Sequence, residues 1–150
     1  MHPRQFDGPS TLRRRHCGVA LALLFGGARR VLASGRDGHP AREWAEAAEQ
    51  MRQRALGWGD QPYGAVLVLG NAVAGEGPSR VVRNADPDAH AEREALRDAQ
   101  RRLGRSRLDG AVLYSTSRPC ALCETAAARA HVARMYFGPG LVDAGVPRER

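Results

Sequence analysis

The apolar positions of residues 41–137 follow two spacings, one typical of amphipathic helices and one typical of buried strands. Over residues 41–56 they recur at steps of three and four, which predicts a helix with one apolar face. Residues 63–69 form a short apolar run between turn residues, which is typical of a buried strand. The same patterns predict the remaining elements, which are strands over 72–76, 111–115 and 133–137 and helices over 88–103 and 119–131.

Turn and capping residues separate these elements. Gly70-Asn71 lies between the first two strands and is typical of a hairpin turn. Asp88 is predicted to be the N-cap of the second helix, and Gly104 is predicted to end that helix. The order helix-strand-strand-helix-strand-helix-strand predicts a layered α/β domain with a mixed sheet.

Composition narrows the class of protein. The chain has 150 residues, of which 43% are hydrophobic and 26% charged, as in a globular domain and unlike a disordered tail. Its three cysteines are too few for a disulfide scaffold. No run of 18 or more apolar residues occurs, so the sequence predicts no membrane-spanning helix.

The net charge of +7 is concentrated near the N-terminus. Residues 1–33 contain six arginines and one acidic residue, whereas arginines and acidic residues almost balance over residues 34–150. A basic surface that binds a polyanion is therefore not indicated for the domain, and the charge argues against nucleic acid as a partner.

Residues 1–33 are predicted to be an N-terminal leader or a disordered extension, followed by a single domain over residues 34–150. Arg13–Arg15 precede the apolar stretch 19–28, and small residues before Ser34 offer a cleavage site. This arrangement favours a signal peptide and export to the periplasm. The alternatives are a cytoplasmic protein with an extra N-terminal segment and a mis-assigned start.

Two short motifs carry the candidate chemistry, and each lies at a predicted helix start. The first is His90-Ala91-Glu92, and the second is Pro119-Cys120-Ala121-Leu122-Cys123. Cys120 and Cys123 are three positions apart, so both sulfurs leave the same face of the first helical turn. Two thiolates and one imidazole nitrogen provide three protein ligands to a tetrahedral zinc ion. The fourth position then remains for water, as in a catalytic zinc site.

Glu92 is the candidate catalytic residue, two positions after the histidine ligand. Zinc lowers the pKa of a bound water, but attack of that water on an aromatic ring carbon also requires proton transfers. A carboxylate at this position can accept the proton of the water, protonate a ring nitrogen and assist the departure of ammonia. The pair H-x-E and P-C-x-x-C is the signature of zinc-dependent nucleobase deaminases.

On these motifs, residues 42–138 resemble the cytidine deaminase-like superfamily, in the branch of guanine deaminases, cytosine deaminases and tRNA adenosine deaminases. The resemblance implies a three-layer α/β/α fold and one zinc ion per subunit, held by His90, Cys120 and Cys123. It also implies that Glu92 is the proton shuttle and that the protein is a homodimer. Further stretches that match the superfamily are Pro62–Val68, Gly75-Glu76-Gly77, Asp86-Pro87, Leu113-Tyr114-Ser115 and Tyr136-Phe137-Gly138.

Three residues depart from the pattern of this branch. Ser79 stands where the family usually has an asparagine whose amide reads the ring edge of the substrate. A hydroxyl is shorter and cannot replace both the N–H donor and the carbonyl acceptor of an amide. Arg118 stands where a glutamate usually precedes Pro-Cys. Arg93 follows the catalytic glutamate where an apolar residue is usual, and its burial requires an acidic partner. The resemblance places the substrate against Ser79, Ala65, Ala91 and Tyr63.

The sequence therefore predicts hydrolytic deamination of a small nucleobase, nucleoside or related aminoheterocycle, with release of ammonia. Deamination of adenosine in tRNA is the alternative enzyme activity, and the absent asparagine and the near-balanced charge argue against it. A zinc-stabilised binding module without turnover is the alternative of another class. Glu92 argues against that alternative, because a purely structural zinc site does not need the carboxylate.

Overall fold

Three helices and five strands make up the part of the chain that the computed structural model describes, residues 42–149. The strands form one mixed sheet in the order β2-β1-β3-β4-β5, in which β3 and β4 are parallel and the other neighbouring pairs antiparallel. The elements in chain order are α1 (Arg42–Gly57), β1 (Gly64–Leu69), β2 (Ala72–Pro78), α2 (Ala91–Leu103), β3 (Val112–Ser115), α3 (Ala121–Arg129), β4 (Arg134–Phe137) and β5 (Val142–Gly145).

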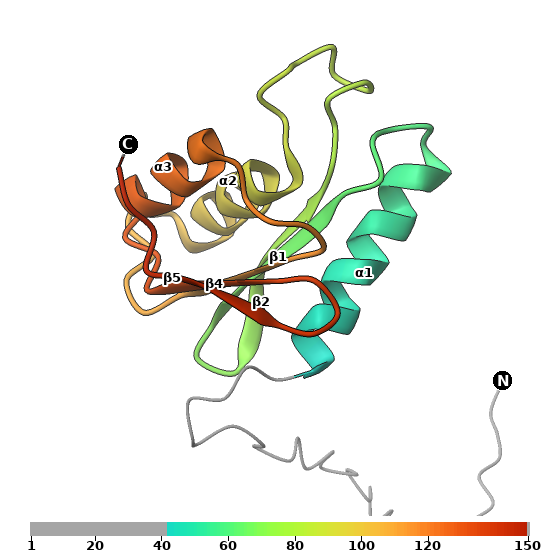
Figure 1. Ribbon diagram of the computed structural model, residues 1–150. Helices are drawn as coiled ribbons and strands as arrows, with labels where there is room; N and C mark the ends of the chain where they lie inside the picture. The colour runs from blue at the N-terminus through green and yellow to red at the C-terminus, as the bar shows by residue number, and fades with distance from the viewer. Residues whose placement is uncertain (1–41, 150) are drawn as a thin grey trace, which may run out of the picture. The chain divides into compact units, whose positions relative to one another are not determined.

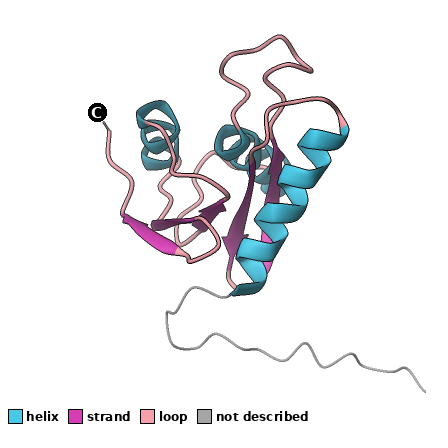
Figure 2. Cartoon of the chain, turned by 45° about the vertical axis from the view of Figure 1, so that its right-hand side comes forward, coloured by secondary structure: helices cyan, strands magenta, loops and turns pink. Residues whose placement is uncertain are grey.

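Alternating side chains of the central strands explain why helices cover both faces of the sheet. On β1, Ala65 and Leu67 pack in one apolar core with residues of α2, whereas Val66 and Val68 pack in a second core with residues of α1. Figures 1 and 2 show α1 on one face of the sheet and α2 and α3 on the other. The three-layer α/β/α architecture predicted from the sequence is confirmed.

The predicted elements are all present, with ends that differ by up to about three residues from the structure. The hairpin at Gly70-Asn71 and the end of α2 at Gly104 are confirmed. The predicted N-cap is wrong, because α2 begins at Ala91 and His90 is its N-cap. The apolar pattern also misses β5, which is short, half exposed and without an apolar run.

Two glycines of β2 allow α2 to lie directly on the sheet. A Cβ atom on Gly75 would stand 2.2 Å from the carbonyl oxygen of Ala95, and one on Gly77 would stand 2.0 Å from that of Ala91. Both distances are far shorter than any real contact, so the helix backbone can approach only where β2 has no side chain. Because Ala91 lies between His90 and Glu92, Gly77 determines how deep the first motif sits.

Substitution of Gly77 by alanine is expected to lower the free energy of unfolding by about 3 kcal/mol, because the helix must move away from β2 to make room for the methyl group. The midpoint of urea unfolding measures this loss. Gly57→Ala is the matched control, since a Cβ atom at Gly57 meets no other atom within 4 Å. An equal midpoint for the two variants would contradict the argument from close packing.

Two sequence predictions fall partly or wholly outside the described residues. The predicted leader over residues 1–33 and the domain boundary at residue 34 lie there. Among the described residues, none of the helices is long and apolar enough to cross a membrane.

Candidate active site and metal centre

The two motifs meet because each lies at the N-terminus of a helix on the same face of the sheet. His90 is the N-cap of α2 and Cys120 is the N-cap of α3, and neither side chain is used to cap its helix. Both have extended backbone angles, with ψ of 151° at His90 and 168° at Cys120. Their side chains are therefore free to point toward each other, and Cys123 joins them from the first turn of α3.

The three side chains have the spacing of a tetrahedral zinc site. His90 Nδ1 lies 3.6 Å from Cys120 Sγ and 3.5 Å from Cys123 Sγ. The three ligand atoms all lie within 4.8 Å of one another. Zinc at its usual bond lengths to sulfur and nitrogen separates two such ligand atoms by about 3.5 Å. The donor set and its geometry therefore fit zinc, with three protein ligands and one position left open.

The two cysteines and the glutamate of the motifs differ in burial. Cys120 is exposed, Cys123 is fully buried, and Glu92 is only 5% exposed. The Cys123 thiol donates a hydrogen bond to Glu92 Oε2 at 3.6 Å. Burial raises the pKa of Glu92 above its ordinary value, and burial also raises the pKa of the Cys123 thiol. A metal ion at this site supplies the positive charge that the buried thiolate and carboxylate need.

A cavity of about 260 Å³ opens beside the candidate metal ligands. Of the predicted substrate-binding residues, Tyr63 and Ala91 line this cavity, and Tyr63 is 42% exposed. Ala65 and Ser79 are fully buried and lie beneath the surface. The residues that line the cavity are Gln61, Tyr63, His90, Ala91, Glu92, Ser117, Arg118 and Cys120.

Ser79 is held by a buried carboxylate. Its hydroxyl donates to Asp60 Oδ1 at 2.8 Å, and Asp60 Oδ2 accepts the backbone N–H of Arg83 at 2.8 Å. Burial would raise the pKa of Asp60, but the hydrogen bonds that it accepts outweigh this effect and hold its pKa below the ordinary value. Asp60 lies in the loop between α1 and β1, and its hydrogen bonds connect this loop to the loop between β2 and α2. Both loops lie in the upper part of Figure 1.

The other two departures from the family pattern have different surroundings. Arg93 lies 2.6 Å from Asp88 with its side chain 25% exposed, so the acidic partner that its burial requires is present. Arg118 is exposed at the cavity and makes no ion pair with any described residue, whereas most arginines of residues 42–149 do.

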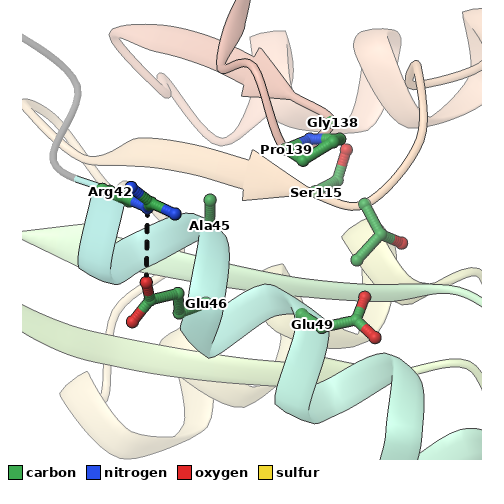
Figure 3. Close-up of a pocket in the computed structure, with 8 residues that line it drawn as sticks. Arg42, Ala45, Glu46, Glu49, Ser115, Gly138 and Pro139 are labelled. Carbon is green, nitrogen blue, oxygen red and sulfur yellow. Dashed lines mark ion pairs between the residues drawn. The ribbon is translucent and has the colours of Figure 1, made fainter.

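A larger hollow of about 350 Å³ lies on the α1 side of the sheet (Figure 3). It is lined by α1 and by residues that follow β3 and β4, and Ser115 and Pro139 face α1 across it. Its two glutamates are already paired, Glu46 with Arg42 at 3.5 Å and Glu49 with Arg52 at 2.6 Å. No histidine or cysteine lines it, so it lacks the ligand types found beside the smaller cavity. It is therefore a weaker candidate for the active site.

Sequence reasoning missed Gln61 and Ser117 as cavity residues. Gln61 directly precedes the matching stretch Pro62–Val68, and this adjacency is a signal that could have found it. Ser117 carries no such signal, because its position follows from the turn after β3, where Ser115 Oγ donates to the carbonyl oxygen of Ser117.

Comparison with known proteins supports a zinc site in this domain. Residues 39–139 match the family described as the cytidine and deoxycytidylate deaminase zinc-binding region. The chain is 41% identical over 80 residues to the tRNA-specific adenosine deaminase of Buchnera aphidicola subsp. Baizongia pistaciae, a match that covers 53% of this chain and 49% of that protein. It is 44% identical over 62 residues to the guanine deaminase of Bacillus subtilis, which covers 41% of this chain and 40% of that protein.

Comparison with solved structures finds the same kind of protein as comparison of sequences. A structure from a study of A-to-I editing by tRNA A34 deaminases superposes with a TM-score of 0.63 at 37% identity, over 65% of this chain and 71% of that one. The matched part spans about half, or less, of the two curated relatives named above. The family match itself covers most of this chain. The chain therefore belongs to the cytidine and deoxycytidylate deaminase zinc-binding family.

Proposed function

We propose that the protein hydrolyses the exocyclic amine of an adenosine in RNA, with transfer RNA as the substrate class, and releases ammonia. The observation that carries the proposal is a buried carboxylate, Glu92, within hydrogen-bond distance of a zinc ligand at the base of a one-base cavity. Relatives named as tRNA-specific adenosine deaminases support the choice of substrate.

The metal ligands and Glu92 have different roles in the proposed reaction. His90, Cys120 and Cys123 would hold the zinc ion, which would supply Lewis-acid activation of the attacking water. Glu92 accepts a proton from that water and delivers it to a ring nitrogen of the base. The water oxygen forms a bond to the carbon that carries the amine. The remaining proton of the new hydroxyl group passes through the same carboxylate to the amine, the C–N bond breaks, and a carbonyl and ammonia result. Glu92 is only 5% exposed, so the proton that it carries is shielded from bulk water.

Arg118 supports an RNA substrate in spite of the nearly balanced charge of the domain. The charge over residues 34–150 argues against a polyanion as partner, but the average does not describe the cavity mouth. Arg118 is exposed there and makes no ion pair within the described part of the chain. An unpaired guanidinium beside a base-sized cavity suits a phosphate of the nucleotide whose base enters.

Deamination of a free purine base is the second candidate. It is favoured by the match to a guanine deaminase and by the cavity itself, which has room for a heterocycle without further nucleotides. Both candidates share the metal site and the role of Glu92. They differ in whether a phosphate contact adds to the recognition of the base.

The zinc-loaded protein is expected to convert adenosine to inosine in a tRNA anticodon hairpin with a kcat/KM at least about ten-fold above that for free adenosine, because the phosphate contact adds binding energy. Nucleoside analysis by mass spectrometry measures inosine, and an ammonia assay with guanine runs beside it. Turnover of guanine together with an inert hairpin would replace the proposal by the second candidate.

Two arginine variants test the phosphate contact in the same assay. Arg118→Glu should raise KM for the hairpin and leave the weak reaction of free adenosine nearly unchanged. Arg105→Glu is the matched control, since Arg105 is also exposed and without an ion pair in the described range, and it does not line this cavity. Equal effects of the two variants would indicate general charge attraction.

Localisation and assembly belong to the same proposal. Export and a tRNA substrate exclude each other, because an exported protein does not meet tRNA. The proposal therefore requires a cytosolic protein, and detection of the native protein in the cytosolic or in the periplasmic fraction of the cell decides between the two. A homodimer is proposed as the working assembly, and size-exclusion chromatography with light scattering tests it.

A further inference from the structure

The hydroxyl of Ser79 is not available to the substrate. Ser79 has no exposed surface, and its single hydroxyl proton is donated to Asp60 Oδ1 at 2.8 Å. Its backbone N–H donates to the carbonyl oxygen of Tyr63 at 3.0 Å. Reading of the base by Ser79 would break a buried hydrogen bond to a carboxylate, which is among the stronger kinds in proteins. Another side chain must therefore recognise the base.

Gln61 has the chemistry that Ser79 lacks. It lines the same cavity as His90 and Glu92, and it is half-buried. Its side-chain carboxamide makes no hydrogen bond with any residue of the described range. An amide offers an N–H donor and a carbonyl acceptor side by side, as the asparagine that is usual in this family does.

The backbone of Gln61 is fixed by the same carboxylate that holds Ser79. Asp60 Oδ1 accepts the backbone N–H of Gln61 at 2.7 Å, and the Gln61 carbonyl oxygen accepts the N–H of Tyr63 at 2.7 Å. Both peptide groups of Gln61 are thus held, and only the side chain is free to turn. An anchored backbone with a free amide at a cavity wall is the arrangement expected of a recognition residue.

We infer that Gln61 reads the ring edge of the substrate, in the role that Ser79 cannot fill. The inference rests on the proposed deamination of a purine, whether in RNA or as a free base. The amide N–H can donate to a ring nitrogen that carries no hydrogen, such as N7 of either purine, and the amide oxygen can accept from a neighbouring N–H where the base presents one. Gln61 is thus a specificity-determining residue supplied by the segment before β1 instead of the end of β2.

Binding to a variant without turnover tests this role. Zinc-loaded Glu92→Gln protein is titrated by calorimetry with guanine and with the anticodon hairpin, alone and combined with substitutions at Gln61. Gln61→Ala and Gln61→Met should each weaken binding of the same probe by about ten-fold or more, because a buried hydrogen bond to the base is lost. Gln61→Met keeps the volume of the side chain and removes only its hydrogen bonds.

Gln53→Ala is the matched control, since Gln53 is an exposed glutamine of α1 that bonds to Glu49 outside the cavity. It should leave the dissociation constant unchanged. Binding of Gln61→Met as tight as that of the parent would overturn the inference, and so would a parent that binds neither probe. If the hairpin does not bind but guanine binds with an affinity that depends on Gln61, the proposal of an RNA substrate is contradicted and the role of Gln61 is retained.

Discussion

Glu92→Gln is expected to lower kcat by about 10³-fold or more while the protein keeps its zinc. Glutamine has the size of glutamate, so the packing against Cys123 Sγ, which lies 3.6 Å from Glu92 Oε2, is kept. It cannot take a proton from water or return one to the ring nitrogen. The metal ligands are unchanged, so the loss isolates proton transfer from metal binding.

The measurement combines single-turnover rates on the reactive substrate with zinc content by elemental analysis. Glu46→Gln is the control, because Glu46 lies on α1 beside the other hollow and, among residues 42–149, pairs only with Arg42. It should leave both quantities unchanged. A Glu92→Gln protein that retains a tenth of the wild-type rate would show that another group carries the proton.

Removal of the metal is expected to abolish activity and to lower the melting temperature by about 10 °C or more. The ligands come from the first turns of α2 and α3, so a bound ion links two helices that are far apart in sequence. Without it, Cys123 stays buried as a thiol next to Glu92, and burial holds the pKa of that thiol above its ordinary value. Metal binding therefore releases protons, and the apparent affinity should rise with pH.

Differential scanning calorimetry before and after treatment with a chelator measures the stability. Zinc should restore both the melting temperature and the activity, and magnesium should restore neither, because thiolate ligands do not suit it. Cys123→Ser should resemble the chelated protein, whereas Cys17→Ser, which changes the cysteine outside both motifs, should not. A chelated protein that melts at the same temperature as the zinc form would contradict the structural role of the ion.

The metal centre could be predicted from the sequence because its determinants are local. His90 and the two cysteines each lie at a helix start, where spacing alone decides which way the side chains leave the backbone. The apolar alternation of β1 predicts the layers for the same reason, since successive residues enter opposite cores.

The substrate-binding side of the cavity could not be predicted in this way. Ser79 and Asp60 are 19 positions apart and meet only after the sheet has formed, so no local pattern shows that the hydroxyl is occupied. The predicted N-cap was wrong because α2 begins at Ala91, three residues after Asp88. A tertiary hydrogen bond such as that between Ser79 and Asp60 decides what a side chain can do, and no local preference shows it.

For the RNA substrate proposed above, the size of the cavity predicts which part of the molecule would react. A space of about 260 Å³ accepts one heterocycle but no base pair. An adenosine stacked in a duplex would have to leave its helix, which costs a few kcal/mol, whereas an unpaired adenosine in a loop costs less. The walls around Glu92 would thus discriminate by the secondary structure of such an RNA before any contact reads its sequence.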